Sequence, residues 1–161
     1  GFTFAQDAPL WMRHSVISPD GTTIAFTYKG DIYTVPVAGG RAMQITTNPA
    51  YDTAPVWSPD SKRIAFASDR MGSLDVYIVA KDGGEPRRLT THSGSETPLA
   101  FTDAGHVLFS AGIMPSAEAV VFPSNGQFNQ VYRVSVEGGR PTMISSMPME
   151  CISINKEGAM L

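Results

Sequence analysis

Val16-Ile17-Ser18-Pro19-Asp20-Gly21 decides the fold of this chain, because a near copy of the stretch returns 40 residues later. The copy is Val56-Trp57-Ser58-Pro59-Asp60-Ser61, and looser versions occupy residues 100–105 and 153–158. A fixed period of 20 to 50 residues is typical of proteins built from one repeated structural unit. The sequence therefore predicts a repeat architecture with a unit of about 40 residues.

A second series of residues recurs once in each of the first three repeats. Tyrosines 33, 77 and 132 each lie in a short β-prone segment that is followed by two glycines. Glycine tolerates the positive φ that tight hairpin turns need. We therefore expect turns at the first residue of each pair, namely Gly39, Gly83 and Gly138.

Each repeat contains four short β-prone segments bounded by turn residues, without the apolar spacing of a helix, which predicts four-stranded antiparallel blades. Blades stacked around an axis form an all-β fold, the β-propeller. We expect a partial propeller over residues 12–161, after an extension at 1–11. Three complete blades are predicted at 12–46, 54–90 and 97–145, and the start of a fourth at 150–161.

The turn between the first two strands of a blade has a local cause. Proline presets φ at its second position, serine suits the first, and the aspartate can accept hydrogen bonds from turn amides. Asp20 and Asp60 are therefore expected to be structural turn residues.

Composition excludes several classes of function. The 161 residues carry a net charge of −3 and no cluster of Lys and Arg, so we expect no nucleic-acid partner. No apolar run reaches the 18 or so residues of a membrane span. Cys151 is the single cysteine, which excludes an intrachain disulfide and a cysteine-based metal site. The chain is long enough for one domain or part of one.

Motifs that carry chemistry are absent from the sequence. It contains no nucleophile elbow, zinc helix, phosphate loop or dinucleotide fingerprint, so we expect no catalytic residues, no metal and no cofactor in this chain. The three histidines lie far apart in different repeats. Only His14 is kept as a candidate binding residue; it lies in the inner strand of the first blade, the strand nearest the propeller axis.

An acid precedes each later inner strand, at Asp52, Glu96 and Glu150. The loops that lead to the inner strands of a propeller emerge beside its axial channel, so we expect the three carboxylates to ring that mouth. The long insert at 111–130 should project on the same face with Phe122. An acidic rim beside an apolar flap could hold a peptide or its amino terminus, whereas the simpler alternative is that these acids are ordinary solvated loop residues.

The repeats resemble the WD-type propeller repeats of the TolB and tricorn protease group. The likeness to the amino-terminal propeller of bacterial tricorn-like peptidases lies in residues 54–60, 66–70 and 84–90. In that family the propeller precedes PDZ and serine peptidase domains, which carry the catalytic residues. The resemblance implies a non-catalytic propeller that binds peptides or proteins, or gates substrates, for a serine peptidase.

Two other functions stay open: a TolB-like periplasmic protein-binding propeller without enzymatic activity, and the propeller cap of a prolyl-oligopeptidase-like hydrolase. Three repeats and part of a fourth cannot close a ring. We therefore expect the remaining blades or the peptidase domains of a longer protein, or a second copy, as a partner. Thr3-Phe4-Ala5 places small residues at the positions of a signal cleavage site, which would fit a periplasmic or secreted location. No basic or long apolar segment precedes them, so the alternative is that this end has no relation to a signal.

Overall fold

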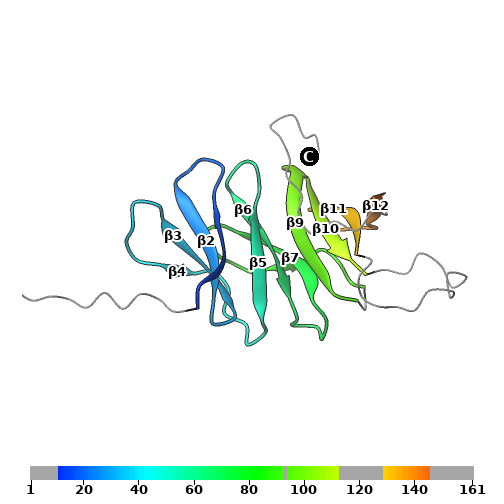
Figure 1. The fold of residues 1–161 in the computed structure, drawn as a ribbon, viewed down its shortest axis with the longest axis horizontal. Helices are drawn as coiled ribbons and strands as arrows, with labels where there is room; N and C mark the ends of the chain where they lie inside the picture. Colours follow the sequence, from blue (N-terminus) through cyan, green and yellow to red (C-terminus); the bar gives the residue numbers. More distant parts are fainter. Residues whose placement is uncertain (1–10, 93, 113–128, 146–161) are drawn as a thin grey trace, which may run out of the picture.

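The computed structural model describes residues 11–92, 94–112 and 129–145, which form three four-stranded antiparallel sheets (Figure 1). The first sheet consists of β1 (Arg13–Ile17), β2 (Thr23–Tyr28), β3 (Asp31–Pro36) and β4 (Met43–Gln44). The second consists of β5 (Asp52–Trp57), β6 (Arg63–Ser68), β7 (Asp75–Ala80) and β8 (Arg87–Arg88). The third consists of β9 (Glu96–Asp103), β10 (His106–Ala111), β11 (Gln130–Ser135) and β12 (Thr142–Ser145).

The strands of every sheet follow their order in the chain, and the sheets stand next to one another as blades (Figure 1). The first strand of each blade is innermost, since β5 lies against both β1 and β9. No helix occurs in the described ranges. The predicted all-β partial propeller is confirmed.

The core lies between the blades rather than inside one sheet. Each blade turns large side chains toward the blade before it and smaller ones toward the blade after it. Between the first two blades the fully buried side chains include Ala25 and Ile32 on one side and Ile64 and Phe66 on the other. Burial on both faces explains why β6 and β7 are nearly continuous apolar runs.

An aromatic pair recurs on the second and third strands of every blade. The rings of Phe66 and Tyr77 are stacked with centroids 6.0 Å apart, and those of Phe109 and Tyr132 are stacked at 5.7 Å. The first blade keeps the same stacked pair in Phe26 and Tyr33.

The turns between the first two strands are held by their aspartates. Asp20 accepts hydrogen bonds from the Ser18 hydroxyl at 2.6 Å and from the backbone amide of Thr22 at 3.0 Å. Asp60 accepts the Ser58 hydroxyl at 2.5 Å in the equivalent turn. These hydrogen bonds stabilise the ionised form, so they lower the pKa of Asp20 to about 2 and also lower the pKa of Asp60.

The turns between the third and fourth strands contain the first glycine of each pair. Gly39, Gly83 and Gly138 have φ angles of 86°, 91° and 87°, in the left-handed region. Each donates its backbone N–H to the carbonyl three residues earlier, at 2.8 to 2.9 Å. A residue with a Cβ would be strained at this φ.

The first blade has an uncovered face. Ile17 at the end of β1 is 54% exposed, whereas Trp57, its equivalent at the end of β5, is only 7% exposed because the first blade covers it. A hollow of about 560 Å³ on this face is lined mainly by apolar residues, among them Met12, Val16 and Phe26.

Candidate functional site

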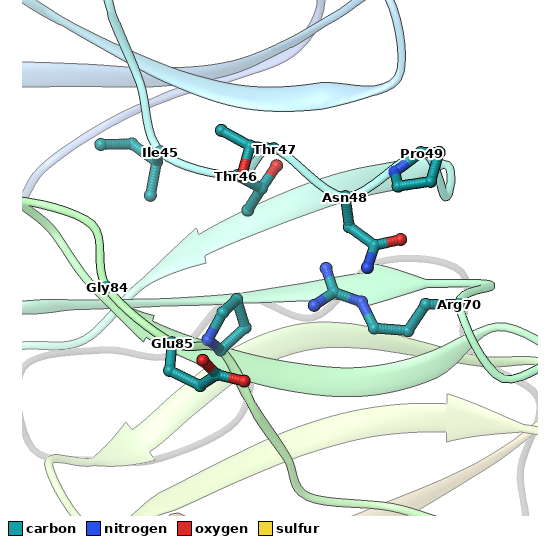
Figure 2. A pocket seen from close by; sticks show the side chains of 9 residues that line it. Ile45, Thr46, Thr47, Asn48, Pro49, Arg70, Gly84 and Glu85 are labelled. Atoms are coloured by element: carbon teal, nitrogen blue, oxygen red, sulfur yellow. The ribbon is translucent and has the colours of Figure 1, made fainter.

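Two equivalent pockets lie where one blade passes into the next. We call the contact between the first and second blades the first junction, and that between the second and third blades the second junction. The pocket at the first junction has a volume of about 350 Å³ and is lined by residues 45–49, Arg70 and residues 84–86 (Figure 2). The pocket at the second junction is larger, about 570 Å³, and is lined by residues 88–92, Glu96, Tyr132 and residues 138–141.

Backbone hydrogen bonds fix an acidic residue at each junction. The amide of Asp52, the first residue of β5, donates to the carbonyl of Gly30 in the preceding blade at 2.7 Å. The amide of Glu96, the first residue of β9, donates to the carbonyl of Leu74 at the same distance. The two acids are therefore structurally equivalent, and the bond places both side chains between blades.

At the first junction the buried acid is paired with an arginine. Asp52 is 0% exposed, and Nη2 of Arg70 lies 3.0 Å from both of its carboxylate oxygens. The Arg70 Nε donates to the Ser68 hydroxyl at 2.8 Å, which fixes the guanidinium from behind. A charge-assisted pair of this geometry compensates much of the cost of burying the carboxylate.

The same guanidinium rests on an aromatic surface. Its central carbon lies 4.5 Å from the ring centroid of Tyr77 and 5.5 Å from that of Phe66. Arginine gains from such stacking through cation–π attraction. Figure 2 shows the guanidinium extending into the pocket toward Asn48, with Glu85 on the opposite wall.

A second acid of the first junction, Asp31, is only partly buried. It accepts a hydrogen bond from the Gln44 side-chain amide at 3.0 Å and one from the Thr46 hydroxyl at 3.3 Å. Burial raises the pKa of Asp31, and the nearby Asp52 charge acts in the same direction. The Asp31 carboxylate nevertheless accepts hydrogen bonds from two neutral side chains.

At the second junction the arginine is paired with the other acid. Nη2 of Arg88 lies 2.9 Å from Oδ2 of Asp75, a carboxylate that is 0% exposed. Neither Asp75 oxygen has a hydrogen bond of good geometry within the described ranges. The contact is therefore electrostatic, with less directional hydrogen bonding than the Arg70 pair.

Glu96 forms no salt bridge within residues 11–92, 94–112 and 129–145. Its side chain is buried, the residue being 1% exposed, and its Oε2 has no hydrogen-bond partner among the described residues. Burial raises the pKa of Glu96 to about 7; the hydrogen bond from Thr90 and the charge of Arg88 act against this rise, while the charge of Asp75 adds to it. A carboxylate with this pKa is partly ionised at neutral pH.

The predicted acidic rim is wrong for the two acids that the structure describes. Asp52 and Glu96 are the first residues of inner strands rather than loop residues, and both are buried between blades instead of exposed around a channel mouth. The physical reason is that the connecting backbone pairs with the preceding blade and turns these side chains inward. Glu150 and Phe122 lie outside the described residues.

His14 lies apart from the junction pockets. It is an exposed residue at an irregularity of β1, with a φ of 52°, and its Nδ1 is 3.1 Å from the Thr53 hydroxyl. The structure thus brings His14 to the second blade but not to Asp52 or Glu96 in any hydrogen bond among the described residues. Whether His14 binds a ligand stays a prediction.

Sequence reasoning missed the three residues that give the junctions their charge pattern, Arg70, Asp75 and Arg88. One signal was available, because an aspartate stands two residues before the tyrosine in both Asp31-Ile32-Tyr33 and Asp75-Val76-Tyr77. A polar residue repeated at the start of an otherwise buried strand indicates a paired charge. The pairing of Arg70 with Asp52 carried no comparable signal.

Within the ranges 11–92, 94–112 and 129–145, no group of three or more His, Cys, Asp or Glu side chains could hold a metal ion. No helix in those ranges has the length and apolar character to span a membrane. The residues that line the junction pockets can offer hydrogen bonds, charge and an aromatic surface to a ligand.

Comparison with known proteins places the repeats in a family. The chain is 35% identical over 102 residues to Tricorn protease homolog 1 of Streptomyces coelicolor, a match that covers 63% of this chain and 9% of that protein. The chain thus spans less than a tenth of that curated relative.

Solved structures share the fold. TolB from Acinetobacter baumannii superposes with a TM-score of 0.65 at 21% identity, over 84% of this chain and 33% of that one. The tricorn protease superposes with a TM-score of 0.56 at 15% identity, over 77% of this chain and 13% of that one. Residues 9–161 match the tricorn protease N-terminal β-propeller domain, and the chain belongs to this family.

Proposed function

We propose that the chain is a non-catalytic part of the propeller of a tricorn-like serine peptidase, where it binds peptides and guides them toward a peptidase domain. Two facts support this proposal. The chain belongs to the tricorn N-terminal propeller family, and a relative at 35% identity is named a protease homolog. That relative is far longer than the matched region, which leaves room for a peptidase domain elsewhere in such a protein.

The observation that carries the binding role is the repetition of a polar pocket at successive junctions. Each pocket is walled by the segment that leaves the last strand of one blade and by the third turn of the next. Equivalent pockets on neighbouring blades offer a chain of similar anchoring points. An extended peptide presents side chains at regular intervals, so it suits such a series.

A catalytic role for these residues has weak support. The contact between Thr53 and His14 is a hydroxyl–imidazole pair, but no carboxylate orients the histidine in any hydrogen bond among the described residues. An activated nucleophile requires a base that is itself held in place. We therefore place the cleavage step outside this chain.

A peptide-binding assay tests the proposal. Fluorescently labelled unstructured peptides are titrated with the chain, and their anisotropy and integrity are recorded together. We expect saturable binding without cleavage. Absence of saturable binding across a varied peptide set would contradict the binding role, and cleavage by the purified chain would contradict the non-catalytic assignment.

We also propose that a further blade, from the same protein or from a second copy, covers the open face of the first blade. Ile17 and the apolar hollow beside it support this, because the same face of the second blade is buried around Trp57. Light scattering of the chain should then reveal self-association that Ile17→Asp abolishes. A strictly monomeric chain with a cooperative melt would contradict this proposal.

We propose further that the protein works in the periplasm or outside the cell. The small residues of Thr3-Phe4-Ala5 and the likeness to TolB support this location. Fractionation of cells that express the parent gene tests it, and recovery in the cytoplasmic fraction alone would contradict it.

A further inference from the structure

The second pocket is lined by the counterparts of the two residues that Arg70 contacts at the first junction. At the first junction Arg70 bridges a buried carboxylate, Asp52, and a tyrosine ring, Tyr77. At the second junction the equivalent residues, Glu96 and Tyr132, line the pocket directly. This pocket is also the larger of the two.

Strand register establishes the equivalence. Asp52 pairs with Ser68 across β5 and β6, and Glu96 pairs with Ala111 across β9 and β10. Arg70 stands two positions after Ser68, so its counterpart in the sequence is Ile113, which carries no charge. The third blade therefore has the acceptor and the ring for a guanidinium, but it has no cation at the position from which the second blade supplies one.

We propose that the pocket at the second junction binds the guanidinium group of an arginine side chain in a bound peptide, with Glu96 as the acceptor and the Tyr132 ring as the stacking surface. The Oε2 of Glu96, which has no hydrogen-bond partner among the described residues, accepts one N–H of the incoming group, as both oxygens of Asp52 do from Arg70. The inference rests on the proposed peptide-binding function and names the side chain that this site selects.

The charges around the pocket agree with a cationic guest. Two buried acids, Asp75 and Glu96, share one arginine, Arg88, and that arginine is engaged by Asp75. Arg140 also lines the pocket, but it is exposed, so solvent and salt screen its repulsion. The planar guanidinium stacks on an aromatic ring and donates in a fork, which the compact ammonium of lysine cannot reproduce.

Small probes test the site on the unaltered chain. Nα-acetyl-arginine N-methylamide is titrated at pH 8 and low salt, with chemical shifts of the chain followed by NMR. The citrulline analogue has the same shape without the charge, and the lysine analogue keeps the charge without the plane. We expect each analogue to bind roughly tenfold more weakly than the arginine probe. Equal binding of the citrulline or the lysine probe would overturn the assignment.

Variants then locate the site. Glu96→Gln should weaken the arginine probe by roughly tenfold, since it removes the charge and keeps the shape. Glu137→Gln is the matched control, because this exposed acid of the same blade faces Arg87 outside the pocket, and it should change affinity by less than about twofold. Equal losses in the two variants would overturn the site.

Three further variants guard against a folding artefact. Tyr132→Leu should weaken the arginine probe while Tyr132→Phe keeps it, because stacking needs only the ring. Arg140→Gln should strengthen binding about twofold by removing a like charge at the mouth. Weaker binding in Arg140→Gln would show that the probe occupies another place.

The outcomes separate this inference from the function on which it rests. If peptides without arginine bind the chain as well as peptides with arginine, the guanidinium site is overturned and the peptide-binding role stands. If the arginine probe binds as described but no peptide does, the site stands and the peptide-guiding role fails.

Discussion

The two blade junctions place equivalent acids between the blades and pair them differently with arginine. In each junction two acids at the starts of strands lie near one arginine that forms an ion pair. At the first junction the arginine neutralises the fully buried acid, Asp52, and leaves the half-buried Asp31 to neutral donors. At the second junction Arg88 neutralises Asp75, and the buried Glu96 has no cationic partner in the part of the chain that the structure describes.

The position of the cation therefore matters more than its presence. A buried carboxylate without compensation either takes up a proton or attracts a partner, because desolvation disfavours its charge. At the first junction the charge of the buried carboxylate is compensated by Arg70. At the second junction the buried Glu96 forms no ion pair among the described residues, which is a property expected of a binding site.

Removing the cation from the first junction should have the largest effect. Arg70→Ala leaves Asp52 buried and uncompensated and also removes the group stacked on Tyr77. The free energy of unfolding should fall by about 3 to 5 kcal/mol, measured by urea denaturation at pH 8.

A double variant shows whether the loss comes from the charge. Arg70→Ala with Asp52→Asn should recover a substantial part of the stability, because the stranded carboxylate is gone. Millimolar methylguanidine should partly restore the single variant and leave the double variant unchanged. If the single and double variants are equally unstable, the arginine acts mainly by packing, and the contrast between the junctions weakens.

At the second junction, replacing Glu96 should raise the free energy of unfolding instead of lowering it. The folded-state pKa of Glu96, about 7, lies above its ordinary value of 4.5, so the folded chain binds a proton more tightly than the unfolded chain. This contribution to stability is complete below pH 4.5 and is lost as the pH rises to about 7. Glu96→Gln removes the loss, so at pH 8 the variant should be the more stable protein, by about 3 kcal/mol at most.

The difference in unfolding free energy between the unaltered chain and Glu96→Gln should therefore grow from pH 4.5 to 7 and be constant above. Asp31→Asn is the matched comparison, because the pKa of Asp31 is also raised but its carboxylate has neutral donors. A Glu96 profile without slope in this interval would show that the carboxylate is compensated in the folded chain.

The fold was predictable because its determinants are local. Serine, proline and aspartate within four residues specify a turn, and the tyrosine segments with their glycine pairs mark the later strands. The turn at Asp20 has the hydrogen bonds that its sequence suggests.

The site was only half predictable, because its decisive contacts are not local. Asp52 and Glu96 could be selected from their position before inner strands, but their burial depends on packing against the preceding blade. Arg70 reaches Asp52 across 18 residues through the register of β5 and β6. A spacing pattern along one chain contains no such information.

A smaller loss of stability is expected when the turn between β5 and β6 is weakened. This variant tests whether substitutions destabilise the second blade at any position or mainly at its junction. Asp60→Ala removes the acceptor for the Ser58 hydroxyl and the Lys62 amide. The loss should be about 1 kcal/mol in urea denaturation, similar to that of a lost helix cap, and probe binding should not change. Asp103 lies in the shorter turn of the third blade and is bonded to Gly105 and His106 instead, so its replacement should behave differently.

The smallest effect should come from the exposed ion pair between Arg87 and Glu137, which also links the second and third blades. Its atoms are 3.2 Å apart, but the side chains are 49% and 77% exposed. Exposed pairs contribute only about 0.2 to 1 kcal/mol, because water and salt screen the attraction. Glu137→Gln should therefore lower the unfolding free energy by a few tenths of a kcal/mol, and 0.5 M salt should erase the difference, whereas the loss in Arg70→Ala should persist in salt because its pair is buried. If Glu137→Gln cost as much as Arg70→Ala, exposure would not be what separates the weak charge contacts of this propeller from the strong ones.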